Sequence, residues 1–99
     1  MMDFGEVDGF DWDAGNARKN ERHGVSRAEA EQVFFDLRLL VVTDHGHSRA
    51  EPRFHGLGAT VEGRLLHVTF TLRMGGSKIR VISARVMSRK ERTYYEQKT

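Results

Sequence analysis

Residues 64–73 alternate apolar and polar side chains, which is the pattern of a β-strand with one buried face. The apolar side chains on one face are Leu66, Val68, Phe70 and Leu72. The polar side chains on the other face are His67, Thr69, Thr71 and Arg73. Because such a strand buries only one side against a core, the polar face is the part of the predicted sheet that a ligand can reach.

Three more segments predict strands, since they are rich in aliphatic and β-branched residues and end at glycine or polar turns. They are residues 39–43, 53–60 and 78–86. Gly56 and Gly58 interrupt the second segment and indicate a bulge or a close approach of another part of the chain. The turns at residues 61–63 and 74–77 are too short for crossovers. The sequence therefore predicts a four-stranded antiparallel sheet.

Helix signals precede the strands. Asp13 is a good N-cap for a first helix, which extends to about His23 and ends at a left-handed Gly24. The motif Ser26-Arg-Ala-Glu29 has the spacing of a capping box and starts a second helix that ends near Phe35. These signals predict two N-terminal helices.

A third helix signal follows the strands. Ser88-Arg-Lys-Glu91 is another capping box, and it begins a C-terminal helix. The predicted order is two helices, four hairpin-linked strands and one helix. Helices grouped outside a run of antiparallel strands indicate an α+β fold rather than an α/β fold.

The length of 99 residues fits a single domain, which we assign to residues 10–99. Residues 1–9 are expected to form a loosely ordered acidic N-terminus, because the first thirteen residues contain five acids and no base. The chain has no cysteine, which excludes disulfides and thiolate catalysis and is compatible with a reducing cytoplasm. No apolar run approaches the roughly 18 residues of a membrane span. We expect a cytoplasmic protein that makes no use of a membrane.

Positive charge is concentrated in the C-terminal part of the chain. Residues 78–98 contain seven Lys or Arg and two Glu, although the formal net charge of the whole chain is only +2. A basic patch beside an ordered strand is typical of a protein that binds a polyanion, and an ordinary solvated surface is the alternative. The candidate RNA-binding residues here are Arg73, Lys78 and Arg89. Arg80 and Arg85 would point to opposite faces of a regular strand unless a bulge intervenes.

The polar residues suit metal-free cleavage of RNA. In that reaction the ribose 2′-hydroxyl attacks the phosphate, so a base must remove its proton and an acid must protonate the leaving 5′-oxygen. Fixed guanidinium groups stabilise the negatively charged transition state. His23 is a candidate acid or base and Glu51 a candidate base. The candidate phosphate-binding residues are Arg53, Arg80 and Arg85.

Several of these residues have a structural alternative. His23 also suits the C-terminus of a helix, where an imidazole interacts favourably with the helix dipole. Glu51 also suits a surface ion pair with a neighbouring arginine. Arg85 also suits a pair with Glu91 or with a helix carbonyl.

A metal site has weak support in the sequence. His45 and His47 lie in one polar loop with Glu51 nearby, but a metal site needs three or four converging ligands. Gly75-Gly76 lacks the spacing of a nucleotide-binding loop, and no Gly-x-Ser-x-Gly motif is present. We expect neither a metal nor a cofactor.

The motifs resemble a known family when they are taken in order. The N-terminal motifs are Phe10-Asp-Trp-Asp13, Asn16, Lys19-Asn20 and His23-Gly-Val-Ser26. The middle motifs are His47-Ser48, Glu51-x-Arg53-Phe54 and Gly63-Arg64-Leu65-Leu66. The C-terminal motifs are Arg80-Val-Ile-Ser-Ala-Arg85, Ser88-Arg-Lys-Glu-Arg92 and Tyr95-Glu96. Across residues 10–96 the chain resembles the BrnT-type toxins of bacterial type II toxin–antitoxin systems.

The resemblance implies a RelE-like ribonuclease fold and a toxin that cleaves RNA without a metal and thereby stops translation. It also implies a BrnA-type antitoxin partner, through which any contact with operator DNA would be indirect. The site residues carried over are His23, Glu51, Arg53, Arg80 and Arg85, with Lys19 and Arg22 as auxiliary phosphate contacts. The chain departs from the family pattern at Arg22, where lysine is usual, and at Pro52, where an acid is usual.

Three functions are therefore open. The first is an RNA-cleaving toxin. The second is a module that binds RNA through its basic patch without cleaving it. The third is a protein that only binds an antitoxin.

Overall fold

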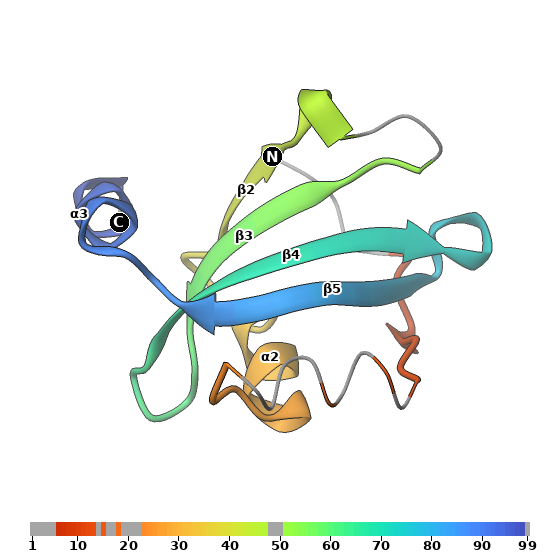
Figure 1. The fold of residues 1–99 in the computed structure, drawn as a ribbon, viewed down its shortest axis with the longest axis horizontal. Helices are drawn as coiled ribbons and strands as arrows, with labels where there is room; N and C mark the ends of the chain where they lie inside the picture. The colour runs from red at the N-terminus through yellow and green to blue at the C-terminus, as the bar shows by residue number, and fades with distance from the viewer. Residues whose placement is uncertain (1–5, 14, 16–17, 19–22, 48–50, 99) are drawn as a thin grey trace.

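A computed structural model describes residues 6–13, 15, 18, 23–47 and 51–98 of the chain. One five-stranded sheet has the strand order β1-β5-β4-β3-β2 (Figure 1). Its strands are β1 (Gly9–Phe10), β2 (Leu40–Thr43), β3 (Phe54–Ala59), β4 (Leu65–Arg73) and β5 (Lys78–Val86). The α-helices of the described residues are α2 (Arg27–Val33) and α3 (Arg89–Lys98). Short 3₁₀ helices, η1 (His45–His47) and η2 (Met74–Gly76), lie in two of the connections.

The expectation of two N-terminal helices and a four-stranded antiparallel sheet is wrong. β1 is a fifth strand that runs parallel to β5, so the sheet is mixed. Of the two helices in the described part of the chain, α2 precedes β2 and α3 is C-terminal. The helix expected over residues 13–23 falls mostly outside the described residues. β1 escaped prediction because two residues carry no periodicity and no turn connects them to a parallel partner far along the chain.

One face of the sheet packs against α2. Phe70 is fully buried there, with its ring centroid 4.9 Å from that of Phe34 and 5.4 Å from that of Phe54. Gly58 lies directly under the helix, and a Cβ built on it would lie 2.8 Å from Cγ1 of Val33. The glycine therefore marks a close approach of α2 to β3, as the sequence indicated.

The α2 helix begins with the expected capping box. Ser26 Oγ accepts from the Glu29 backbone N–H at 3.1 Å, and the Glu29 carboxylate accepts from the Ser26 N–H at 3.1 Å. Glu29 also binds Arg64 Nη1 at 2.9 Å, which ties the helix to the β3–β4 hairpin. The Arg64 hydrogen bond and the Ser26 N–H together lower the pKa of Glu29.

A bulge in β5 brings Arg80 and Arg85 to the same face. Ser83 pairs with Thr69 and Val81 pairs with Phe70, so Ile82 is the extra residue. Arg80 then lies opposite Thr71 and Arg85 opposite His67, and directly paired residues share a face. This is the polar face, on the side of the sheet opposite α2.

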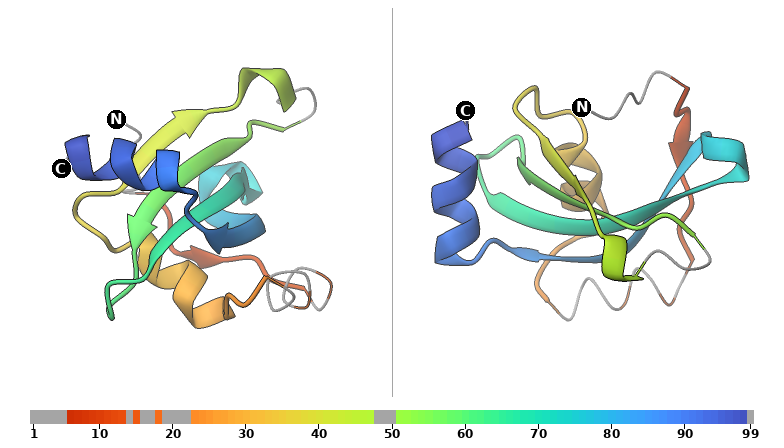
Figure 2. Two further views of the ribbon diagram at one scale, coloured as in Figure 1. Left: turned by 60° about the vertical axis from the view of Figure 1, so that its left-hand side comes forward. Right: turned by 90° about the horizontal axis from the view of Figure 1, so that it is seen from above.

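The C-terminal helix α3 packs on one end of that polar face (Figure 2). Its buried residue Tyr95 clusters with Leu57 and Met87. The Tyr95 hydroxyl donates to Asp36 Oδ2 at 2.6 Å, and burial together with this bond raises the pKa of Tyr95 to about 12. No helix in the described ranges is long and apolar enough to cross a membrane.

Candidate active site

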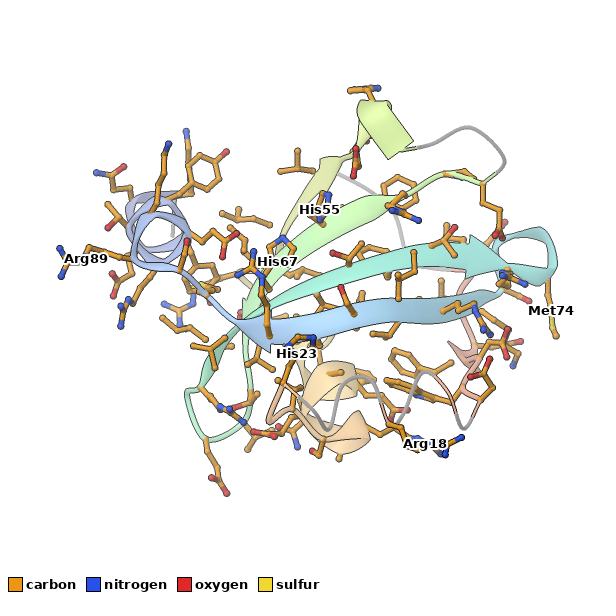
Figure 3. The ribbon with its side chains drawn as sticks, in the orientation of Figure 1. Arg18, His23, His55, His67, Met74 and Arg89 are labelled. Carbon is orange, nitrogen blue, oxygen red and sulfur yellow. The ribbon has the colours of Figure 1, made fainter. Side chains whose placement is uncertain are left out.

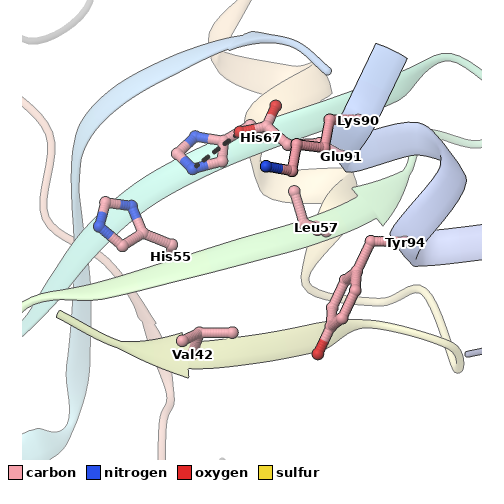
Figure 4. Close-up of a pocket in the computed structure, with 7 residues that line it drawn as sticks. All are labelled: Val42, His55, Leu57, His67, Lys90, Glu91 and Tyr94. Atoms are coloured by element: carbon pink, nitrogen blue, oxygen red, sulfur yellow. Dashed lines mark ion pairs between the residues drawn. The ribbon is translucent and has the colours of Figure 1, made fainter. Parts of the chain in front are cut away.

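A groove of about 480 Å³ lies between α3 and the polar face of the sheet (Figure 4). It is lined by Val42, His55, Leu57, His67, Lys90, Glu91 and Tyr94. The sheet residues come from β2, β3 and β4, and the others come from the first two turns of α3. The groove is large enough for one nucleotide-sized ligand.

Two histidines lie side by side in this groove (Figure 3). The rings of His55 and His67 are 5.0 Å apart and tilted by 38°. His55 Nε2 lies 2.9 Å from Asp44 Oδ2, and its Nδ1 lies 3.0 Å from the Thr69 hydroxyl. Because a carboxylate can only accept, Nε2 of His55 carries a proton. The Asp44 and Thr69 contacts therefore fix both the orientation and the tautomer of this ring.

His67 is the more buried of the two imidazoles, with 13% of its side chain exposed against 32% for His55. Burial is the main reason that the pKa of His67 is lowered, and the Glu91 carboxylate, 3.8 Å from its Nε2, opposes this shift. The ring is thus neutral at neutral pH and can accept a proton there.

Glu91 connects α3 to the sheet. Its two carboxylate oxygens accept from Arg85 Nη1 at 2.8 Å and Nη2 at 2.9 Å, and Oε1 also accepts from the Ser88 backbone N–H at 2.9 Å. The Arg85 hydrogen bonds are the largest cause that lowers the pKa of Glu91 to about 2. Glu91 is therefore ionised at neutral pH and clamps the start of the helix to β5.

Arg85 keeps donor capacity while it is clamped. Its Nη1 also donates to the Val86 carbonyl at 3.2 Å. A guanidinium has five N–H donors, so Nε–H and one Nη2–H remain for another acceptor. With 45% of its side chain exposed, Arg85 can present these donors to a phosphate.

The groove thus combines a neutral imidazole with a second imidazole held by a carboxylate, and the Arg85 guanidinium lies beside it, bound to the lining residue Glu91. These groups can accept a proton, donate a proton and stabilise a phosphate charge. Among the described residues, no group of three His, Asp or Glu side chains converges closely enough to hold a metal ion.

Comparison with known protein families decides the assignment. Residues 12–91 match the family described as "Ribonuclease toxin, BrnT, of type II toxin-antitoxin system". The chain belongs to the BrnT family. Membership makes it a ribonuclease toxin, with RNA as its substrate class and an antitoxin protein as its partner. No curated protein matches the sequence.

Four of the basic residues predicted to bind RNA or its phosphates, Arg73, Lys78, Arg80 and Arg85, are paired with carboxylates in this BrnT-family toxin. On the polar face, Lys78 Nζ lies 2.6 Å from Asp8 Oδ1. Arg80 pairs with Asp11 at 3.3 Å and also with Asp13, and the Asp13 hydrogen bond is the main cause that raises the pKa of Arg80. The N-terminal acids therefore neutralise the first part of β5.

Glu51 and Arg73 form a further ion pair at the far end of β4, with Arg73 Nε 2.8 Å from Glu51 Oε2. Arg53 follows Glu51 closely and directly precedes β3, so these predicted residues share one end of the sheet. The structure thus separates them from Arg85, which lies opposite His67 at the α3 end of the same face.

The remaining predicted residues lie elsewhere. His23 is exposed just before α2, and the carbonyl of the next residue, Gly24, accepts from Arg64 Nη1 at 2.8 Å. Arg89 is exposed at the first position of α3. Lys19 and Arg22 lie outside the described residues. Of the residues predicted to be catalytic, Arg85 is the one that contacts the groove residue Glu91.

Sequence reasoning missed His55, Asp44, Lys90 and Tyr94 as members of a site. A partial signal for His55 was present. His55 and Leu57 are two positions apart in a predicted strand, so their side chains lie on the same face of the sheet. The two neighbouring glycines obscured this alternation. Lys90 and Tyr94 are four residues apart and share a helix face, but no sequence pattern showed that this face borders the sheet.

The free energy of unfolding of the toxin should fall at low pH because of Glu91. Its pKa falls from an ordinary 4.5 to about 2 on folding, so its contribution is complete above pH 4.5 and disappears as the pH approaches 2. The loss is at most about 3 kcal/mol in the free energy of unfolding. Chemical denaturation from pH 7 to pH 2 measures it, with Glu91→Gln compared with Glu96→Gln on the same helix. A Glu91→Gln variant with the wild-type pH profile would contradict the clamp.

Proposed function

We propose that this toxin is a metal-independent endoribonuclease that cleaves RNA in the α3 groove. The observation that carries the proposal is the placement of three groups on one face of the sheet. His67 on β4 lies opposite Arg85 on β5, and the ring of His55, on β3 at the other side of β4, is 5.0 Å from the His67 ring. Two imidazoles and a guanidinium supply the proton transfers and the charge stabilisation that RNA cleavage needs, since the RNA provides its own nucleophile.

In the proposed reaction, neutral His67 removes the proton from the ribose 2′-hydroxyl. The O2′–P bond forms, the P–O5′ bond breaks, and the departing O5′ takes a proton from Nδ1 of the imidazolium form of His55, which would exchange its contact with the Thr69 hydroxyl for the RNA. The products are a 2′,3′-cyclic phosphate and a 5′-hydroxyl. Asp44 holds His55 during the transfer, and the remaining N–H groups of Arg85 bind the phosphate oxygens.

The other predicted residues would bind the RNA strand on either side of the cut. Arg53, Arg73 and Glu51 mark one end of the sheet face, and Lys78 and Arg80 lie on β5 between that end and Arg85. The strand would exchange its phosphates for the carboxylates that now pair with these cations. Arg89 on α3, and Lys19, Arg22 and His23 before α2, are proposed as outer contacts.

The cellular role follows from cleavage of RNA. We propose that the toxin forms its domain from residues 10–99, acts in the cytoplasm and stops translation by cutting RNA. A BrnA-type antitoxin would neutralise it and would carry the contact with operator DNA.

The decisive experiment is incubation of the pure toxin with single-stranded and ribosome-associated RNA in excess EDTA. We expect cleavage with 2′,3′-cyclic phosphate ends and a loss of about 10²-fold or more in Arg85→Ala, from the loss of transition-state charge stabilisation. Arg92→Ala, on the exposed side of α3, is the matched control and should cleave at the wild-type rate. Absence of cleavage in EDTA that is restored by a divalent cation would refute metal independence. Wild-type rates in Arg85→Ala would refute the phosphate role.

A role limited to antitoxin binding is the second candidate, and exposed apolar residues favour it. Phe35 is 76% exposed and Leu37 is 99% exposed, directly after α2. A protein surface of this kind suits a protein partner. If the pure toxin cleaves no RNA in any condition but binds its antitoxin, this second candidate replaces the first.

A further inference from the structure

The outer half of the α3 groove is apolar and has two opposed walls. Val42 on β2 and Tyr94 on α3 are 49% and 44% exposed, and both line the groove. Leu57 on β3 is buried and forms the floor between them. Lys98 lies one helical turn beyond Tyr94, with its Nζ 5.6 Å from the centre of the ring. Tyr94 is thus a positioned aromatic wall whose opposite wall is aliphatic.

The inner end of the groove is polar. His67, Glu91 and Lys90 line it, and Lys90 reaches from α3 toward the sheet as Tyr94 does (Figure 4). A flat ligand with two apolar faces and a polar edge matches this combination of walls and end. A nucleobase has that form. A base that stacks on an aromatic side chain is stabilised whatever the sequence of the RNA around it.

We propose that the α3 groove binds a nucleobase of the RNA, with a preference for guanine, beside the phosphate that is cleaved. The inference rests on the proposed function, because His67 is both a lining residue of the groove and the proposed proton acceptor. A base seated against Tyr94 would bring its own ribose toward His67 and Arg85. The base pocket and the catalytic groups therefore form one continuous site.

The preference for guanine comes from the hydrogen-bonding groups at the polar end. Lys90 can only donate hydrogen bonds. The Glu91 carboxylate already accepts from Arg85 and from the Ser88 N–H, so the group that selects the edge of the base is the Lys90 donor. Guanine presents two acceptors, O6 and N7, on one edge, while adenine presents a donor beside its N7. Pyrimidines have one ring and would leave more of Val42 and Tyr94 uncovered.

The test is binding of mononucleotides to the intact toxin, measured by calorimetry and NMR shift changes. The probes are guanosine 3′-monophosphate, adenosine 3′-monophosphate and ribose 5-phosphate, which has no base. We expect guanosine monophosphate to bind about tenfold more tightly than adenosine monophosphate and ribose phosphate to bind weakest. Tyr94→Ala should weaken guanosine monophosphate about tenfold or more, and Tyr94→Phe, which keeps the ring, should not.

Lys90→Met should remove the preference between the two purines while leaving the stacking contribution in place. Equal binding of all three probes, or no effect of Tyr94→Ala, would overturn the base pocket. Cleavage assays on the same variants separate the two proposals. An active wild type whose cut sites are the same in Lys90→Met would retain the nuclease and reject the base preference. A wild type that cleaves no RNA but binds guanosine monophosphate at Tyr94 would reject the nuclease and retain the base pocket.

Discussion

Replacing His67 with asparagine should lower the rate of RNA cleavage by about 10²–10⁴-fold, the usual contribution of a positioned acid–base group. The imidazole faces the groove, and its burial lowers its pKa, so it is the group best prepared to accept the 2′-hydroxyl proton. In the wild type the acidic limb of the pH–rate profile should therefore rise through a pKa below 6.5. Steady-state cleavage of a short RNA from pH 4.5 to pH 8 measures both effects.

The control for this prediction is His45→Asn, because His45 is an exposed histidine on η1 and does not line the groove. It should cleave at the wild-type rate. A His67→Asn variant that retains its fold by circular dichroism, binds RNA and still cleaves normally would remove His67 from the reaction. If His55→Asn alone then lost activity, the base would have to be sought elsewhere on this face.

Replacing Asp36 with alanine should reduce the free energy of unfolding by about 3–5 kcal/mol, because it leaves several donors without their acceptor. Asp36 Oδ2 accepts from the Ala59 N–H at 2.8 Å and from the Tyr95 hydroxyl at 2.6 Å, and Oδ1 accepts from the Arg38 N–H at 2.9 Å. Burial raises the pKa of Asp36, but these hydrogen bonds outweigh it and the net pKa is lowered. The carboxylate thus joins the segment after α2, the end of β3 and α3.

Urea denaturation of Asp36→Ala and Tyr95→Phe separates the contributions. Tyr95→Phe removes one hydroxyl and keeps the buried ring, so it should cost about 1 kcal/mol. Since α3 supplies Lys90, Glu91 and Tyr94 to the groove, Asp36→Ala should also reduce RNA cleavage at temperatures where the sheet remains folded. A cost below about 1 kcal/mol in Asp36→Ala would mean that water replaces the carboxylate.

The local elements were predictable from sequence because each carries its own signal. The alternation in residues 64–73 identified β4 and its buried face, and the fully buried Leu66, Val68 and Phe70 confirm it. The capping boxes at Ser26 and Ser88 have the expected hydrogen bonds. These features depend on residues a few positions apart, which is the range over which a sequence pattern is informative.

The features that join distant segments were not predictable in the same way. Pairing of β1 with β5 depends on contacts between residues about seventy positions apart, and the bulge at Ile82 has no signal of its own in the sequence. The polar face is also less open than its pattern suggested. Thr71 is buried because the Pro52 carbonyl lies over it and accepts from its hydroxyl. The candidate site was therefore only partly visible, through Arg85 and the face that carries His67.

The pairing of basic residues on the polar face has a consequence for the energetics of RNA binding. Arg73, Lys78 and Arg80 each hold a carboxylate of the same chain. Binding of nucleic acid usually gains entropy because phosphates shed condensed cations when protein cations replace them. Here each arriving phosphate must also set free a tethered carboxylate, which then takes up cations from solution. The toxin therefore carries its own anionic competitor, and part of the ionic-strength dependence of a basic RNA-binding surface is cancelled within the folded chain.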